Sequence, residues 1–112
     1  MKKELTILSG IKPSGELHLG NYLGALQNFL ELQKDYNCYF SIVDLHSLTQ
    51  TFTSKEKSKQ IVEMATDFLA LGLDPNRSTL FIQSQVHEHA ELAWIFNCIT
   101  SYSELLRMTQ FK

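Results

Sequence analysis

The sequence predicts an open α/β fold in which parallel strands alternate with helices. Three observations support this prediction. The 112 residues contain three short apolar, β-prone runs, each run precedes a segment with apolar residues at helical spacing, and turns containing Gly and Pro lie at residues 10–15 and 72–76. Alternation at this spacing favours parallel strands joined by right-handed crossovers. A chain of this length can bury one hydrophobic core, so we expect a single domain.

The first unit begins with a strand near Leu5–Ser9, which we expect to end at Gly10. A turn rich in Gly and Pro comes next, with Gly15 at a position that permits a positive φ. A helix is then expected near His18–Lys34, because its apolar residues recur at offsets of three, four and seven.

The second unit has a nearly continuous apolar strand near Tyr39–Val43, which is typical of a central position in a sheet. Its helix is expected near Ser54–Leu71. Thr53 and Glu56 have the spacing of a capping box at its start, and Gly72 is typical of the position just after a helix.

The third unit comprises a strand near Leu80–Gln83, a helix near Glu88–Ile99 and a last helical piece near Tyr102–Thr109. Within the longer helix, Trp94 and Phe96 stand at helical spacing among apolar neighbours. We expect these two side chains in the core or in a subunit contact.

Composition and charge exclude several classes of protein. Hydrophobic residues make up 44% of the chain and charged residues 20%, which excludes a disordered or collagen-like protein. No apolar run approaches the ~20 residues of a membrane span and no signal peptide is recognisable, so we expect a cytoplasmic protein without membrane association. The net charge of −2 argues against a broad basic surface for nucleic acid. Lys55, Lys57 and Lys59 are expected to form a solvated face.

Neither the cysteines nor the histidines indicate a metal site. Cys38 and Cys98 belong to no CxxC pair, and we expect two reduced, half-buried thiols. His87 and His89 have no third ligand nearby in the sequence. We therefore predict that the chain holds no metal of its own.

Ligands of an open parallel sheet bind at the carboxyl ends of its strands, which here lead into residues 10–21, 44–47 and 84–88. The first of these segments is the richest in chemistry. His18 and Asn21 open a helix, share one face at the positive end of its dipole, and leave a gap above Gly20. Such a site suits a phosphate group. The alternative is that both side chains merely cap the helix.

The whole segment SGIKPSGELHLGNY, residues 9–22, resembles the first signature of class I aminoacyl-tRNA synthetases, which has the form His-x-Gly-His or His-x-Gly-Asn. Among these enzymes it is most similar to the tryptophanyl-tRNA synthetases. Three later stretches strengthen the resemblance, which covers essentially the whole chain: Ile42–His46, Gly72–Pro75, and Ala90–Trp94 leading on to Arg107–Lys112.

The resemblance implies the amino-terminal half, residues 1–112, of a Rossmann-like catalytic domain that activates L-tryptophan with ATP and transfers it to tRNA. His18 and Asn21 would be the catalytic donors to the phosphate oxygens, and Gly20 would clear space for the adenine and ribose. The other nucleotide-binding residues would be Gly10, Lys12, Pro13 and Ser14. Many family members carry Gln in place of Lys12, so its role stays open between a phosphate contact and a solvated loop residue. ATP would arrive with Mg²⁺.

For the amino acid, the resemblance implies a partly present tryptophan pocket whose residues are Leu8, Gly10, Val43, His46, Met108 and Gln110. For Leu8 and Val43, plain core packing is the alternative. The family's indole-recognising Asp, its Lys-Met-Ser-Lys-Ser loop and its anticodon-reading helices would lie beyond Lys112. We therefore expect tRNA to bind through regions outside these residues, and the first strand to lie at an uncovered sheet edge. We also expect the 112-residue chain alone to self-associate and to be weakly active or inactive.

Two other functions remain open. The chain could belong to a different adenylyl-transferring enzyme with the same His-x-Gly-Asn turn. It could also be a truncated, non-catalytic paralogue that binds a nucleotide or a partner chain.

The family resemblance further implies a homodimer.

Overall fold

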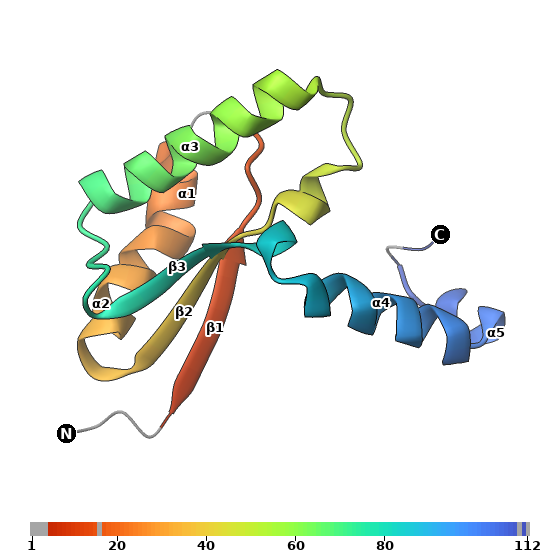
Figure 1. The fold of residues 1–112 in the computed structure, drawn as a ribbon. Helices are drawn as coiled ribbons and strands as arrows, with labels where there is room; N and C mark the ends of the chain where they lie inside the picture. The colour runs from red at the N-terminus through yellow and green to blue at the C-terminus, as the bar shows by residue number, and fades with distance from the viewer. Residues whose placement is uncertain (1–4, 16, 110, 112) are drawn as a thin grey trace.

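The structure, a computed structural model, describes residues 5–15, 17–109 and 111. Three strands, β1 (Thr6–Ile11), β2 (Asn37–Ile42) and β3 (Ser78–Ile82), form a parallel sheet in the order β1-β2-β3 (Figure 1). The predicted α/β class is therefore confirmed, and so is the edge position of β1. Each strand differs from its predicted range by one or two residues.

The largest of these differences concerns the end of β1. The pairing with β2 continues to Ile11, which is the register partner of Ile42, and the Val43 N–H donates to the Ile11 carbonyl at 3.0 Å. The prediction that Gly10 ends the strand was wrong, because the ladder holds one further residue. Gly10 lies inside β1.

The first helical segment is not one continuous α-helix. It consists of α1 (Leu19–Asn21), a π-helical segment η1 (Tyr22–Leu26) and α2 (Gln27–Asp35). The range His18–Lys34 was thus located correctly, but the π-helical interruption was missed. A π-helical turn inserts one residue and rotates the helix beyond it, and such turns are frequent near functional sites.

The second helix, α3 (Ser54–Ala70), agrees with its prediction at both ends. The Glu56 N–H donates to the Thr53 hydroxyl at 3.2 Å, and the Thr53 N–H donates to the Glu56 carboxylate at 2.9 Å. Gly72, just beyond the helix, has a φ of 112°. The capping box and the glycine that ends the helix are both confirmed.

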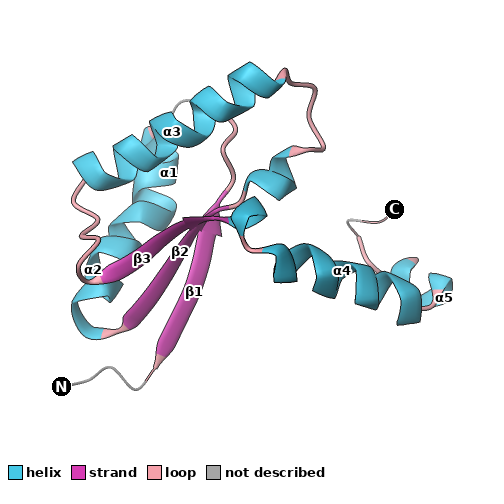
Figure 2. Ribbon diagram, viewed as in Figure 1, coloured by secondary structure: helices cyan, strands magenta, loops and turns pink. Residues whose placement is uncertain are grey.

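Both crossover helices cover the same face of the sheet (Figure 2). Their common core is built on three aromatic rings, Phe29 of α2, Phe40 of β2 and Phe68 of α3. The rings of Phe29 and Phe40 stack with centroids 4.1 Å apart, and the Phe68 ring meets the Phe29 ring edge-on at 6.4 Å. Because the strand order is sequential, crossovers of one hand place both helices on one face.

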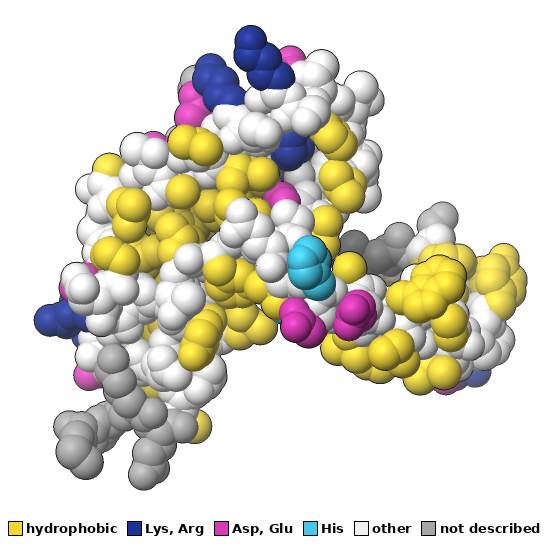
Figure 3. All heavy atoms as spheres, viewed as in Figure 1, with side chains coloured by type: hydrophobic (Ala, Val, Ile, Leu, Met, Phe, Trp, Pro, Cys, Tyr) yellow, Lys and Arg dark blue, Asp and Glu magenta, His cyan; other side chains and the backbone are white. Residues whose placement is uncertain are grey.

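The third unit departs from this layered arrangement. The helix α4 (His87–Ile99) and the short α5 (Tyr102–Leu105) project away from the sheet (Figure 1). Trp94 is 69% exposed and Phe96 52% exposed, so neither lies in the core, and the subunit contact stays a prediction. The space-filling view shows apolar side chains spread over this projecting part (Figure 3). The last helix was also predicted too long, since it ends at Leu105.

Two expectations about side-chain burial need correction. Cys38 is fully buried in the core and Cys98 is exposed on α4, so the two thiols are not both half-buried. Lys57 is buried, and the expected solvated face at residues 55–59 therefore loses its middle member. Among the described residues, no helix is both long enough and apolar enough to cross a membrane.

Candidate functional site

The three strands end level with one another, because Ile11 pairs with Ile42 and Ile42 pairs with Ile82. The segments beyond the strand ends are joined by side-chain hydrogen bonds. The Ser84 N–H donates to the Asp44 carboxylate at 3.0 Å. The His46 Nδ1 and the Gln83 Oε1 lie 3.1 Å apart. The carboxyl edge of the sheet is thus a cross-linked platform, and all three candidate segments start from it.

His18 and Asn21 cap each other at the start of α1. The Asn21 N–H donates to the His18 Nδ1 at 3.3 Å, and the His18 N–H donates to the Asn21 Oδ1 at 3.3 Å. This arrangement is a capping box with His in place of the usual Ser or Thr. The capping role that the sequence left open is therefore real.

The cap also determines what the two side chains offer to a ligand. A neutral imidazole that accepts at Nδ1 carries its proton on Nε2, and an amide that accepts at Oδ1 keeps both hydrogens of its NH₂ group. Among the described residues, no hydrogen bond engages either the His18 Nε2 or the Asn21 Nδ2. The cap therefore leaves two donors available at one helix start, where the helix dipole also favours an anion.

Gly20 gives room to the His18 ring. A Cβ at this position would lie 3.0 Å from both Cε1 and Nδ1 of His18. The other glycine expected at the nucleotide site, Gly10, faces a different obstacle. A Cβ there would lie 2.7 Å from the Ser41 carbonyl oxygen and 2.8 Å from the Val43 Cγ1. Close packing therefore leaves no room for a side chain at Gly10, whereas a side chain at Gly20 would displace the His18 ring.

The turn between β1 and α1 is anchored on one side. The Pro13 side chain is fully buried, Lys12 is half-buried and Ser14 is exposed. The Lys57 Nζ donates to the Pro13 carbonyl at 3.2 Å, which ties this turn to α3. Sequence reasoning missed this contact, because it joins residues 44 positions apart.

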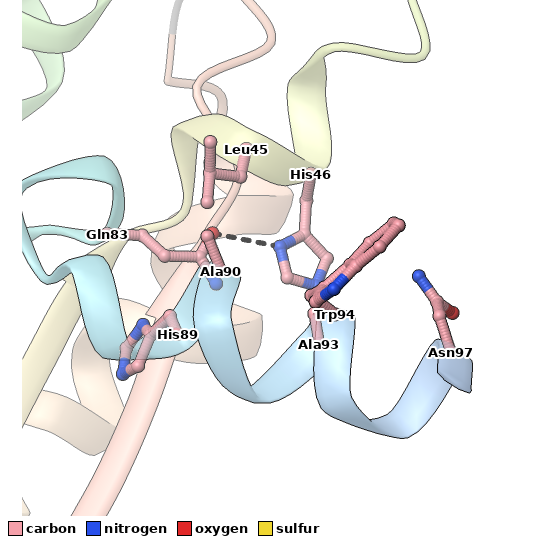
Figure 4. Close-up of a pocket in the computed structure, with 8 residues that line it drawn as sticks. All are labelled: Leu45, His46, Gln83, His89, Ala90, Ala93, Trp94 and Asn97. Atoms are coloured by element: carbon pink, nitrogen blue, oxygen red, sulfur yellow. Dashed lines mark hydrogen bonds between the residues drawn. The ribbon is translucent and has the colours of Figure 1, made fainter. Parts of the chain in front are cut away.

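A cavity of about 420 Å³ opens beside η2 (Asp44–Ser47) and η3 (Gln83–Gln85) (Figure 4). His46 and Gln83, which are hydrogen-bonded to each other, line one side of it. Trp94 and its neighbours on α4 line the other. The full lining consists of Leu45, His46, Gln83, His89, Ala90, Ala93, Trp94 and Asn97.

Leu8 does not line this cavity. It is 66% exposed on the face of the sheet that α2 and α3 leave uncovered, and it lines a second cavity of about 370 Å³. His89 is shared by both cavities, so Leu8 and His46 lie in adjoining hollows. Val43 lies beside Gly10 rather than in the lining of either hollow, and Met108 is 53% exposed beyond α5. Gln110 lies outside the described residues.

Two buried polar atoms at this edge were missed by sequence reasoning. The His89 Nδ1 and the Ser41 Oγ have no hydrogen-bond partner within the described part of the chain. The His89 ring meets the Phe81 ring edge-on, with centroids 6.1 Å apart. Buried polar groups normally have partners, so each is a candidate ligand contact. The spacing of apolar residues in the sequence gives no signal for such atoms.

No group of three or more His, Cys, Asp or Glu side chains suited to a metal ion occurs among residues 5–15, 17–109 and 111.

Comparisons with known proteins identify the family of the chain. The family model for class I tRNA synthetases (W and Y) matches residues 1–112. A tryptophan--tRNA ligase from Caldanaerobacter subterraneus subsp. tengcongensis is 54% identical over 106 residues, which are 95% of this chain and 32% of that protein. The corresponding ligase from Rickettsia bellii is 52% identical over 112 residues, 100% of this chain and 34% of that one.

Solved structures show the same relationship. The chain superimposes on a tryptophanyl-tRNA synthetase from Campylobacter jejuni, complexed with ADP and tryptophan, with a TM-score of 0.84 and 34% identity. The match covers 92% of this chain and 32% of that one. The chain thus spans about a third of the length of the relatives it matches. It belongs to the class I tRNA synthetases (W and Y), and within that family it is homologous to the tryptophan--tRNA ligases.

Proposed function

We propose that residues 1–112 supply the nucleotide-binding part, and some of the tryptophan-binding part, of a catalytic domain that makes tryptophanyl-adenylate from L-tryptophan and ATP. The single observation that supports this most is the reciprocal cap of His18 and Asn21, which leaves two donors at a helix start on the carboxyl edge of the sheet. The homologue from Campylobacter jejuni binds ADP and tryptophan, as its complex shows.

In this reaction the tryptophan carboxylate attacks the α-phosphorus of ATP in line, and pyrophosphate leaves with Mg²⁺ as part of the substrate complex. Negative charge grows on the phosphate oxygens during the attack. The His18 Nε2–H and the Asn21 amide donate to those oxygens, and fixed donors of this kind stabilise the transition state more than the bound substrate. Gly10, Lys12, Pro13, Ser14 and Gly20 shape the nucleotide site around them.

The tryptophan pocket is proposed at the two adjoining hollows. His46 lines one of them and Leu8 the other. An indole ring is large and apolar, and the uncovered face of the sheet offers it an apolar surface. Val43 and Gly10 would border the site at the strand ends, and Met108 and Gln110 would approach from the segment after α5.

Transfer of tryptophan to tRNA, action in the cytoplasm and a homodimeric state complete the proposal, and these rest on the family membership. One structural feature supports the dimer. On α4, the apolar side chains Leu92, Trp94, Ile95, Phe96 and Ile99 are all more than half exposed. A surface of this kind favours association, and sedimentation at several concentrations would show a monomer if this part of the proposal fails.

Two alternatives make different predictions. Another adenylyl-transferring enzyme would exchange pyrophosphate with a substrate other than tryptophan. A non-catalytic interaction module would bind neither ATP nor tryptophan in a calorimetric titration. The proposal is tested by ATP–pyrophosphate exchange in the gene product that carries residues 1–112. The exchange is measured with tryptophan, with tyrosine and with no amino acid. Exchange that depends on tryptophan supports it, and exchange that ignores tryptophan refutes it.

A further inference from the structure

A buried lysine beneath the nucleotide turn has no part in the proposed reaction so far. Lys57 lies near the start of α3 and is only 8% exposed. Lysine is almost never this deeply buried unless its ammonium group is paired. The burial of Lys57 therefore needs an explanation, whereas the residues on either side of it in the sequence are exposed and need none.

The Lys57 ammonium has three partners, of which Gln60 and Phe52 are close in sequence and Pro13 is distant. It donates to the Pro13 carbonyl at 3.2 Å and to the Gln60 Oε1 at 2.9 Å. It also lies 5.2 Å from the centroid of the Phe52 ring, within the range of a cation–π contact. No carboxylate is among these partners, so the positive charge is not neutralised by them.

The contact with Pro13 determines the orientation of the next peptide group. A trans peptide is planar, and its C=O and N–H point in opposite directions. There is no cis peptide bond among the described residues. Because the Pro13 carbonyl points at Lys57, the Ser14 N–H points away from α3. Within the described part of the chain, no hydrogen bond uses that N–H.

We propose that Lys57 is a positioning residue for the nucleotide. It holds the Pro13 carbonyl so that the Ser14 N–H stays turned away from α3, where it is available to donate to a phosphate oxygen of ATP. The buried proline ring holds the same turn from the core side. This inference rests on the proposed function for its nucleotide part, whereas the tether itself does not.

The chain offers a matched control. Lys59 lies on the same helix, 74% of its side chain is exposed, and it pairs with Glu63 at 3.4 Å. Lys57→Met removes the ammonium group and keeps an unbranched side chain of similar length. Lys59→Met likewise removes an ammonium group, at an exposed position that makes no contact with the Pro13 carbonyl. Lys57→Arg keeps N–H donors at the buried position and serves as the conservative variant.

The tether is tested by the amide resonance of Ser14 in the gene product that carries residues 1–112. The Ser14 nitrogen is bonded to the Pro13 carbonyl carbon, so its chemical shift responds when that carbonyl loses its donor. We expect a shift in Lys57→Met, none in Lys59→Met, and a near-native position in Lys57→Arg. An unchanged Ser14 resonance in a folded Lys57→Met protein overturns the tether.

The nucleotide role is tested by calorimetric affinities for ATP and for tryptophan in the same proteins. We expect Lys57→Met to weaken ATP binding by about tenfold, since misplaced positioning groups have effects of this order or larger. Tryptophan binding should be unchanged, and Lys57→Arg should restore most of the ATP affinity. A displaced Ser14 resonance with normal ATP affinity overturns the positioning role. A wild-type protein that binds no ATP refutes the proposed function, and the Ser14 resonance still decides on the tether.

Discussion

The backbone N–H of Asn21 and the imidazole Nδ1 of His18 lie 3.3 Å apart, and the return contact from the His18 N–H to the Asn21 Oδ1 has the same length. Helix capping and ligand binding are often treated as competing explanations for a polar pair at a helix start. In this pair they use different atoms, because the cap consumes one acceptor on each side chain and leaves the donors. The two functions can therefore be separated by substitution.

Asn21→Asp keeps an oxygen that can accept from the His18 N–H but removes the amide donor. We expect it to retain most of the thermal stability and to slow adenylate formation, with a cost near the ~3 kcal/mol that loss of one such donor typically causes. Asn21→Ala should lose both the cap and the donor. Pyrophosphate exchange and thermal unfolding on both variants measure the two effects. If Asn21→Asp exchanges at the wild-type rate, Asn21 is only a cap.

Gly20→Ala tests whether the His18 ring needs the space above residue 20. The added Cβ would lie 3.0 Å from two atoms of the ring, so the ring must move. Alanine is the better helix former by about 1 kcal/mol, which should offset the strain in thermal unfolding. We expect near-native stability with slower adenylate formation and unchanged tryptophan affinity. Native exchange rates would show that the ring position does not matter.

Gly10→Ala is expected to act on stability instead. Its Cβ would meet backbone and side-chain atoms of β2 and the residue after it at 2.7–2.8 Å, and a strand pair cannot move apart as easily as a side-chain tip. Overpacking of this kind costs about 1–3 kcal/mol, which denaturant unfolding can resolve. Gly24→Ala is the control, because nothing lies within 4 Å of the corresponding position. Equal effects of the two substitutions would contradict the packing explanation.

The cap of α3 should make part of the stability depend on pH. Hydrogen bonds from the Thr53 hydroxyl, and then from its backbone N–H, hold the pKa of Glu56 below the ordinary value of 4.5. A carboxyl with a lowered folded-state pKa contributes stability above its unfolded value and loses it as pH falls through the folded value. The stability difference between wild type and Glu56→Gln should therefore be full at pH 7 and shrink below about pH 4.5. A difference that does not vary with pH would contradict this.

Much of the fold could be predicted from sequence because it depends on local signals. Apolar runs located the three strands, and the Thr53–Glu56 spacing and Gly72 located both ends of α3. The π-helical turn at Tyr22–Leu26 was missed, since the apolar residues between Leu19 and Leu30 recur at offsets of three and four, as they would in a continuous α-helix.

The features that sequence could not show depend on distant contacts. Nothing near Lys57 in the sequence indicates that a carbonyl 44 positions away will accept from it. Trp94 has the residue type and spacing of a core position, but its helix leaves the layered domain. In the candidate site, His18 and Asn21 were predicted from their spacing and motif, whereas the buried His89 Nδ1, which has no hydrogen-bond partner among the described residues, became visible only in the packed structure.

In the proposed function, this carboxyl edge activates tryptophan through donors held by the His18–Asn21 cap. The most direct test is ATP–pyrophosphate exchange by the gene product that carries residues 1–112, with and without tryptophan, compared between wild type and His18→Ala. We expect exchange that requires tryptophan and falls by about two orders of magnitude in His18→Ala, with tryptophan affinity nearly unchanged. Exchange that His18→Ala leaves intact, or that proceeds without tryptophan, would contradict it.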